Sequence, residues 1–320
     1  MQRDYTRNAP TSQSVDTSSL DTLVTEGINP LTRDLDAVDL ESALRLMNDE
    51  DALVPAAVRV EIPAIARAVL LAEASLRAGG RLIYVGAGTS GRLGCLDAAE
   101  IPPTFGMEPG FVIGVIAGGD AALRSSVEGA EDVPEAGAAA VQALGVSERD
   151  TVIGIAASGR TPFVVGALAE ARRRGAHTVG LANHQPSELE AHAEVTIVPL
   201  VGPEVISGST RLKSGTSQKL VLNMISTMTM VRLGKTYENL MVDLCPTNEK
   251  LRHRARRLVA QVVGCLREEA EGLLAAAGGR TKTAMLMGLT GLDAAGAAAQ
   301  LAAAGGRLRK ALERARGDAA

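Results

Sequence analysis

The sequence predicts an α/β protein: a three-layer αβα sandwich with a five-stranded parallel sheet, followed by a small all-helical C-terminal subdomain. Five short runs rich in Val and Ile are almost continuously apolar, which is typical of strands buried on both faces. Helical stretches separate these runs, and this alternation favours parallel strands joined by right-handed crossovers. The predicted strands are residues 81–86, 111–116, 151–156, 177–182 and 194–200.

Helices are expected before, between and after these strands. Apolar residues recur at helical spacing in 36–50 and again in 55–77, where Pro63 should kink or split the helix. Between the strands we expect helices near 90–100, 120–145, 162–175 and 187–192, the last of which is short enough to be little more than a turn. After them we expect a long helix over 209–233 and three or four short helices in 247–320. This pattern divides the chain into a disordered tail (1–22), N-terminal helices packing on the sheet domain (23–78), the sheet domain (79–240) and a helical subdomain (241–320).

Composition narrows the function before any motif is considered. The chain has three Tyr, three Phe and no Trp, so aromatic platforms that stack on nucleic-acid bases are not expected. Its formal net charge of -4 provides no broad basic field for DNA or an anionic membrane surface. Three widely spaced cysteines indicate neither a disulfide framework nor a zinc site, and reduced thiols fit the cytoplasm. No metal and no nucleotide cofactor are expected.

Two strand-to-helix turns have the composition of a phosphate site. In open parallel sheets, ligands bind beyond the carboxyl ends of the strands, and helix N-termini there attract anions. The first turn, in Gly-Ala-Gly-Thr-Ser-Gly at 86–91, offers Gly88, Thr89 and Ser90. The second, after strand 151–156, offers Ser158, Gly159, Arg160 and Thr161 before Pro162. An ordinary pair of capped turns is the alternative, but two such turns on adjacent strands favour a small phosphorylated ligand.

Three glutamates are candidates for proton transfer or substrate binding. Glu100 follows the first turn by one helix, which Pro102 and Pro103 should end, Glu128 lies in a Gly-rich segment, and Glu204 precedes Ser209, Thr210 and Lys213. Ten helical residues span about 15 Å, so Glu100 lies too far from Ser90 for one sugar phosphate to reach both. Either the helix breaks near Gly94, or Glu100 serves the site of a second subunit. The histidines show no metal spacing, and His184 and His192 are expected on the surface.

Seven motifs together resemble the bacterial N-acetylmuramic acid 6-phosphate etherases of the sugar isomerase (SIS) domain superfamily. They span about residues 23 to 312 and lie at 25–36, 46–51, 80–106, 117–132, 152–168, 201–227 and 239–251. Cys95 and Ala99 depart from the family pattern without replacing a proposed functional residue.

The resemblance implies cleavage of the ether between D-lactate and carbon 3 of N-acetylmuramic acid 6-phosphate, during murein recycling. The products would be N-acetylglucosamine 6-phosphate and D-lactate, formed without a cofactor. Catalytic roles carry over to Glu100 and Glu128, and family precedent favours Glu100 as the group that protonates lactate. The sequence alone leaves acid and base unassigned, and Glu204 could bind substrate or compete as the base. SIS domains usually pair, which implies a homodimer.

Two other functions remain open at this point. A non-catalytic sugar-phosphate sensor would share these motifs, as glucokinase regulatory proteins do, although they are about twice as long and carry two SIS domains. An aldose–ketose isomerase would share the phosphate turns but would need no lactate pocket. Lactate release from the natural substrate, measured beside turnover of fructose 6-phosphate, separates the three.

Overall fold

The computed structural model describes residues 26–243 and 249–317. The expected tail at 1–22 and Cys245 therefore lie outside the described residues.

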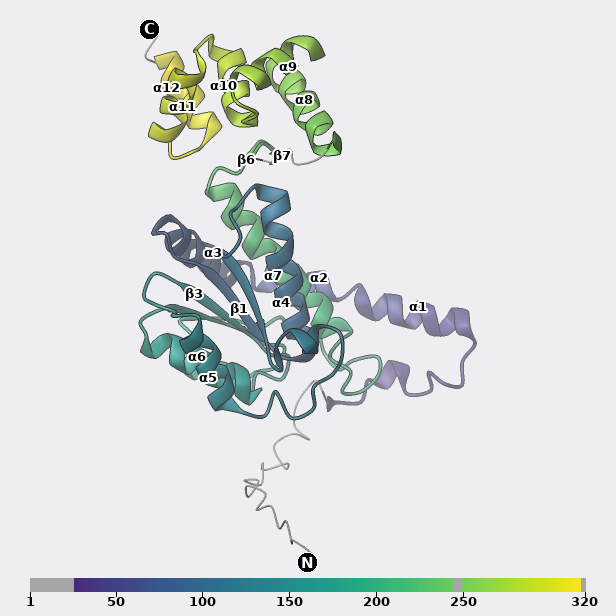
Figure 1. Ribbon diagram of the computed structural model, residues 1–320. Helices are drawn as coiled ribbons and strands as arrows, with labels where there is room; N and C mark the ends of the chain where they lie inside the picture. Colours follow the sequence, from purple (N-terminus) through teal and green to yellow (C-terminus); the bar gives the residue numbers. More distant parts are fainter. Residues whose placement is uncertain (1–25, 244–248, 318–320) are drawn as a thin grey trace, which may run out of the picture.

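A single parallel sheet forms the centre of the molecule, as predicted (Figure 1). Its strands are β1 (Leu82–Gly86), β2 (Val112–Ile116), β3 (Thr151–Ile155), β4 (His177–Leu181) and β5 (Val195–Ile197), in the order β2-β1-β3-β4-β5. All four pairings are parallel. Because the chain leaves β1 in one direction and β3 in the other, the order reverses between these two strands, and ligands of open α/β sheets bind at such a reversal.

Helices cover both faces of the sheet because alternate strand residues point to opposite sides. Leu82 and Tyr84 join one buried cluster with helices α3 (Ile62–Arg77), α4 (Gly88–Phe105) and α7 (Lys213–Arg232). Ile83 and Val85 join another with α5 (Pro134–Ala143) and α6 (Pro162–Arg173). The three-layer prediction is confirmed.

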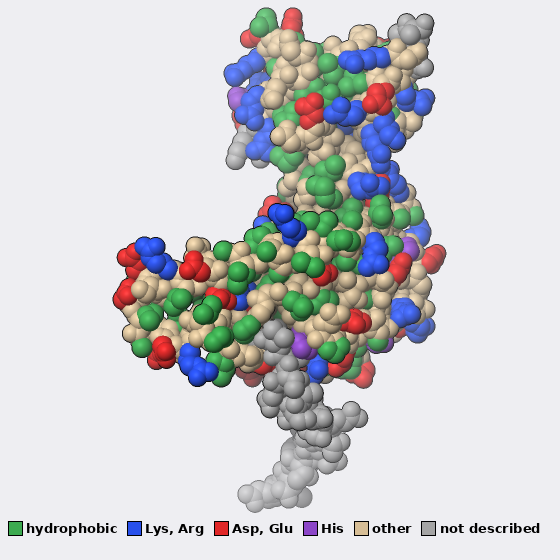
Figure 2. Space-filling model, turned by 180° about the vertical axis from the view of Figure 1, so that it is seen from behind, with side chains coloured by type: hydrophobic (Ala, Val, Ile, Leu, Met, Phe, Trp, Pro, Cys, Tyr) green, Lys and Arg blue, Asp and Glu red, His purple; other side chains and the backbone are tan. Residues whose placement is uncertain are grey.

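The N-terminal part forms α1 (Leu40–Asp51), α2 (Val54–Val60) and α3. The helix predicted over 55–77 is split at Glu61, two residues before Pro63, whose ring cannot continue the preceding helix. Whereas α3 packs on the sheet and on α7, α1 projects sideways with the 3₁₀ turn η3 (Pro30–Thr32) as an N-terminal arm (Figure 1). Hydrophobic side chains lie along this arm (Figure 2), and Leu40 is 76% exposed.

Two segments differ from the sequence prediction. The stretch 120–145 is not one helix but the 3₁₀ turn η4 (Gly119–Leu123), a loop and α5. The connection at 187–192 is the short turn that its length indicated, the 3₁₀ turn η5 (Glu188–Ala191). Helix α4 is unbroken at Gly94 and does not end at Pro102 and Pro103 but runs on to Phe105. The helix continues through both prolines although neither has an N–H, and it ends where left-handed Gly106 donates its N–H to the Pro102 carbonyl at 3.0 Å.

The C-terminal subdomain contains five helices, rather than the three or four expected: α8 (Glu249–Val263), α9 (Arg267–Ala276), α10 (Thr281–Thr290), α11 (Ala294–Ala303) and α12 (Leu308–Gly317). They enclose a hydrophobic cluster of their own. An unpredicted hairpin, β6 (Thr236–Tyr237) and β7 (Leu240–Met241), connects them to α7. The carboxylate of Glu73 on α3 pairs with Arg232 at the end of α7 and with Arg307 before α12, and so ties the two parts together.

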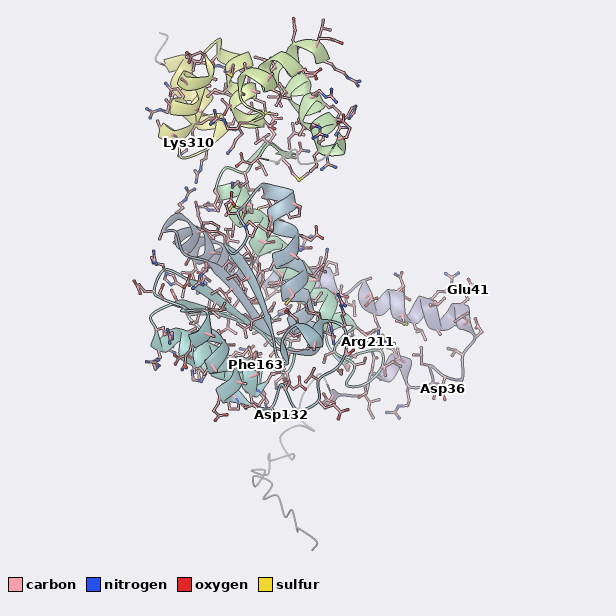
Figure 3. All side chains as sticks on the ribbon, viewed as in Figure 1. Asp36, Glu41, Asp132, Phe163, Arg211 and Lys310 are labelled. Atoms are coloured by element: carbon pink, nitrogen blue, oxygen red, sulfur yellow. The ribbon has the colours of Figure 1, made fainter. Side chains whose placement is uncertain are left out.

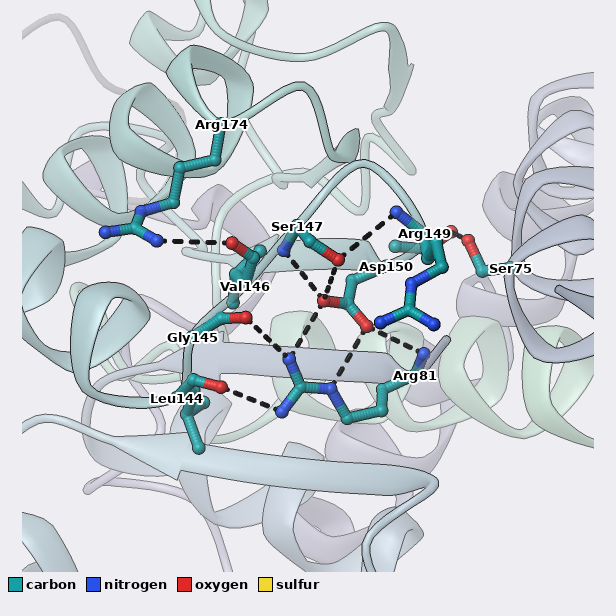
Figure 4. A network of polar contacts seen from close by, with 10 residues as sticks. Ser75, Arg81, Leu144, Gly145, Val146, Ser147, Arg149, Asp150 and Arg174 are labelled. Atoms are coloured by element: carbon teal, nitrogen blue, oxygen red, sulfur yellow. Dashed lines mark hydrogen bonds and ion pairs between the residues drawn. The ribbon is translucent and has the colours of Figure 1, made fainter. Parts of the chain in front are cut away.

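A buried ion pair fixes the amino ends of the two central strands (Figure 4). Asp150, just before β3, accepts hydrogen bonds from the backbone N–H of Arg81 at 2.8 Å and from its guanidinium at 2.9 and 3.0 Å. Burial alone would raise the pKa of Asp150, but hydrogen bonds from Arg81 and Ser147 together with the Arg81 charge lower that pKa overall. This pair lies at the opposite end of β1 and β3 from the predicted phosphate turns, so it stabilises the sheet rather than the site. Within the described part of the chain, no helix has the length and apolarity that crossing a bilayer requires.

Candidate active site

The site begins where β1 and β3 end, side by side at the reversal of strand order. Gly86 of β1 pairs with Ile155 of β3, so the turn before α4 and the turn before α6 emerge next to each other. The sequence identified both turns, and the strand order places them together at the position where this fold class binds ligands.

The first turn leaves helix amides available to a ligand. Ala87 caps α4 without a side-chain hydrogen bond, and Gly88 is exposed at a φ of 52°, a conformation that favours glycine. The first helical amides, from Gly88 to Ser90, therefore have no capping side chain. The Ser90 hydroxyl is buried and donates to Gln218 on α7 at 2.9 Å.

Behind Ser90, a chain of polar contacts joins three elements. Gln218 donates to the side-chain oxygen of Asn183, which follows β4, at 3.1 Å. Asn183 in turn donates to the hydroxyl of Ser217 at 2.7 Å and to the carbonyl of Pro199 at 2.9 Å. Because these buried groups satisfy one another, they fix Ser90 against α7.

The second turn presents side chains more than helix amides. Pro162 has no N–H, and the next amide, that of Phe163, already donates to the carbonyl of Glu131 at 3.0 Å. Figure 3 shows Phe163 and Asp132 close together at this end of the sheet. Ser158 Oγ accepts the Arg160 N–H at 3.3 Å, which shapes the turn and leaves Arg160 and Thr161 half-buried. We infer that the first turn offers an anionic ligand most of the backbone amides, and that the second turn offers it the positive charge of Arg160.

The prediction of an exposed His184 is wrong. His184 is only 5% exposed, since the segment after β4 folds back on the second turn: Asn183 donates its backbone N–H to Ala157 at 2.9 Å, and Ser187 bonds to the Gly159 carbonyl at 3.2 Å. Burial, and next the positive charge of Arg160, lower the pKa of the His184 imidazole. The imidazole is therefore part of the site's surroundings.

Glu204 and Lys213 are both buried and engaged in protein contacts. Glu204 is 0% exposed and accepts the backbone N–H groups of Lys213 and Ser214, each at 2.9 Å, so it caps the start of α7. The ammonium of Lys213, 1% exposed, pairs with Glu50 at the end of α1, and Asn29 donates to the same carboxylate at 2.8 Å. This capping moves the start of α7 from the predicted residue 209 to residue 213.

Ser209 and Thr210 lie in the half-buried turn before α7, beside the first phosphate turn. A Cβ placed on Gly215 would lie 3.4 Å from the Thr89 methyl group and 3.5 Å from the Thr210 carbonyl oxygen. The start of α7 therefore approaches the first turn of α4 closely, and this contact brings the predicted residues Thr89 and Thr210 into one neighbourhood.

Glu128 lies next to the first turn. Its exposed side chain lines a hollow of about 300 Å³ together with Gly88, Arg92, Val127 and Glu131. The hollow sits over the carboxyl end of β1, so Glu128 can reach a sugar whose phosphate lies at the amino end of α4.

Glu100 lies elsewhere in the same chain. It lines a separate hollow between α4 and α7 with Lys219 and Asn223. A Cβ on Gly94 would meet the Tyr84 Cβ at 2.8 Å, so this glycine allows α4 to pack closely on β1 and does not break the helix. Since α4 is continuous, about 15 Å of helix rise separates Glu100 from Ser90. The explanation by a helix break near Gly94 is therefore wrong, and service of a second subunit's site stays a prediction.

Gln218, Asn183 and Lys219 were not predicted as site residues. The tertiary structure brings Gln218 and Asn183 to the first turn and Lys219 beside Glu100. The sequence feature that could have pointed to them is a polar residue near the end of a buried strand or on the inner face of an apolar helix. Among the described residues, no group of three or more His, Cys, Asp or Glu side chains could hold a metal ion.

Comparison with known proteins shows the family of this chain. Residues 64–172 match the model of the glucokinase regulatory protein N-terminal SIS domain, and residues 121–228 match the SIS domain model. The N-acetylmuramic acid 6-phosphate etherase of Salmonella typhimurium is 54% identical over 295 residues, which cover 92% of this chain and 99% of that protein. The chain belongs to the N-acetylmuramic acid 6-phosphate etherase family. An etherase of this family from Mesorhizobium japonicum is also 54% identical, over 92% of this chain and 96% of that one.

The similarity of this chain to solved structures is low. The phosphoheptose isomerase of Neisseria gonorrhoeae is 19% identical with a TM-score of 0.46, and the match covers 60% of this chain and 98% of that one. That of Francisella tularensis is 20% identical with a TM-score of 0.45, over 62% of this chain and 98% of that one.

Proposed function

We propose that this chain is an N-acetylmuramic acid 6-phosphate etherase, which releases D-lactate and N-acetylglucosamine 6-phosphate without a metal or nucleotide cofactor. The observation that carries the proposal is the 54% identity, over 99% of their length, to proteins of that name. A regulator or an isomerase would lack this full-length similarity. We place the enzyme in the cytoplasm, where thiols such as Cys95 and Cys265, free in the structure, stay reduced.

The chemistry needs two carboxyl groups and a fixed phosphate. Opening of the sugar ring exposes an aldehyde, which acidifies the hydrogen on carbon 2. Glu128 removes that proton and Glu100 protonates the lactate oxygen as the bond to carbon 3 breaks. Water then adds across carbons 2 and 3 of the unsaturated aldehyde, with the proton transfers reversed. The phosphate is held by Gly88, Thr89, Ser90, Ser158, Gly159, Arg160 and Thr161, and this fixes the reacting carbons.

The loop before α7 completes the proposed binding surface. Ser209 and Thr210 contact the sugar phosphate from the side of α7. Glu204 and Lys213, which the sequence also suggested as binding residues, act through the loop: the first caps α7 and the second anchors the loop to Glu50. We also propose that the chain divides after residues 22, 78 and 240, as its pattern of helices and strands indicates.

A homodimer resolves the distance between Glu100 and the phosphate turns. Glu128 lies beside the first turn of its own copy, whereas we propose that Glu100 reaches the site of its partner. Apolar side chains on α4 and α7 support a contact between copies on this face, because Leu96, Met224 and Met228 are 55%, 38% and 47% exposed.

Two experiments test these assignments. Glu128→Gln should lose both lactate release and exchange of the carbon 2 hydrogen with solvent deuterium, whereas Glu100→Gln should lose lactate release and keep the exchange. Normal lactate release by both variants would refute the assignment. Wild-type protein should release lactate and leave fructose 6-phosphate unchanged.

The shared site is tested by mixing the two inactive variants after dissociation. In a mixed dimer, one site holds both mutations and the other holds neither. With random pairing, about half of the dimers are mixed and about a quarter of the sites are intact, so about a quarter of wild-type activity should return. No recovery in verified mixed dimers would mean that both carboxylates of a site come from one chain.

A further inference from the structure

The hollow that contains Glu100 is chemically unlike the one that contains Glu128. It measures about 190 Å³ and lies between α4 and α7. On α4, Leu93, Leu96 and Glu100 are spaced three and four residues apart, so they lie on one helix face. On α7, Leu222 and Asn223 follow Lys219 by three and four residues, so these residues also share one helix face. One acid, one cation and an apolar wall therefore line a space that is sufficient for a group of a few heavy atoms.

The floor of this hollow is a closed polar network. The buried carboxylate of Asp97 accepts hydrogen bonds from Tyr84 at 2.9 Å, Asn223 at 2.7 Å and Ser226 at 3.1 Å. Burial, together with the Asp97 charge, raises the pKa of the Tyr84 phenol well above its ordinary value, so this donor stays protonated. Asp97 already accepts these three hydrogen bonds, so it holds the floor of the hollow in place. Lys219 and Glu100 at the rim are the groups that can bind a ligand.

The ammonium of Lys219 is not engaged by the protein residues that the structure describes. Its side chain is exposed, and within the described residues it makes no ion pair or hydrogen bond. The other cation near a catalytic carboxylate, Arg92, differs in both respects. Its Nε donates to the Leu123 carbonyl at 3.3 Å, and Glu128 and Glu131 line the same hollow. Lys219 is therefore better placed than Arg92 to receive an anionic group of the substrate.

The substrate carries one such group besides its phosphate. The lactyl substituent consists of a carboxylate, a methyl group and the ether oxygen that must be protonated. We propose that the hollow between α4 and α7 binds the lactyl group, with its carboxylate on Lys219, its methyl group against Leu93 and Leu96, and its ether oxygen facing Glu100. The inference rests on the proposed function and adds the residue that recognises the leaving group. All of these residues lie on α4 and α7 beside Glu100. The subsite therefore acts at the same phosphate site as Glu100, whether that site belongs to its own copy or to the partner.

The test compares two substrates and two matched variants. The substrates are N-acetylmuramic acid 6-phosphate and its analogue with a neutral primary amide in place of the lactyl carboxylate. The variants are Lys219→Met and Lys310→Met. Lys310 is also exposed and without an ion pair in the described part of the chain, and it lies on the C-terminal helices, far from Phe163 and Asp132 (Figure 3). Lactate or lactamide release gives kcat and KM for each combination.

Wild-type enzyme should prefer the carboxylate by about 10- to 100-fold in kcat/KM, as expected for a hydrogen bond to a charged group. The preference should appear in KM, because the contact exists before and during the reaction. Lys310→Met should keep it, whereas Lys219→Met should lose it.

Two results would overturn the subsite. A Lys219→Met enzyme that keeps the wild-type preference would refute it, and so would a wild-type enzyme that turns over both substrates equally. Lys219→Gln serves as a second variant with the same expected outcome, and thermal unfolding checks that each is folded. A wild-type enzyme that releases nothing from the natural substrate would refute the proposed function instead.

Discussion

Replacement of Glu204 separates a structural glutamate from a catalytic one. In the wild-type structure, its two carboxylate oxygens accept the Lys213 and Ser214 amides at 2.9 Å in a fully buried position. Glu204→Gln keeps one acceptor oxygen and turns an NH2 group toward the other amide, so one hydrogen bond to a charged acceptor is lost. Such bonds contribute about 1.5–3 kcal/mol, and the free energy of unfolding should fall by that amount. The negative charge at the N-terminus of α7 is lost as well.

The measurement is thermal unfolding combined with lactate release. At about 2–4 °C per kcal/mol for a chain of roughly this size, Tm should fall by about 3–12 °C. The kcat per folded molecule should stay within a few-fold of wild type. Glu128→Gln is the matched control: its exposed carboxylate makes no hydrogen bond among the described residues, so Tm should be unchanged while activity is lost. An unchanged Tm with a large loss of kcat in Glu204→Gln would show that Glu204 takes part in the chemistry.

Two further predictions concern the packing of α4 and a buried imidazole. Gly94→Ala places a Cβ 2.8 Å from that of Tyr84, so α4 must shift. This overpacking should cost about 1–3 kcal/mol of stability and lower both Tm and kcat. In Gly272→Ala the new Cβ meets no atom within 4 Å, so stability should instead rise by up to about 1 kcal/mol. Equal Tm changes in the two variants would contradict this packing. Because burial, and then Arg160, lower the pKa of His184 below 6.5, the unfolded chain binds its proton first as the pH falls. The stability of the wild-type protein should therefore decline as the pH falls from about 6.5 to the pKa of His184 in the folded state. When Tm is measured against pH, His184→Asn should show a smaller decline over this range than the wild type. The same decline in both proteins would contradict the prediction.

The strands and the phosphate turns could be predicted because local sequence encodes them. A run such as Thr151–Ile155 is apolar on both faces, and only a central parallel strand needs that pattern. The turns follow the strands directly, so a glycine at 88 and a serine at 158 lie at the ligand edge whatever the remainder of the chain does. The split at Pro63 likewise follows from the missing N–H and the ring of one residue.

Helix ends and side-chain surroundings were predicted less well, since distant residues decide them. The prediction that Pro102 and Pro103 stop α4 was wrong, because the helix runs on through both of them to a left-handed cap at Gly106. The single helix over 120–145 was wrong because residues 124–133 form the loop that carries Glu128 to the first turn. His184 was expected on the surface, and the fold of residues 183–189 onto Gly159 buries it.

By itself, the sequence determined the fold class, the positions of the two strand-to-helix turns and the motifs of an etherase family, because each depends on residues adjacent in the chain. Only the tertiary structure decided which polar residues remain available to a substrate. Glu204 is occupied by the amides of α7 and Lys213 by Glu50, 163 positions earlier, while Glu128 and Lys219 are left exposed. Hydrogen bonds between such distant residues follow from packing, and local sequence patterns do not contain that information.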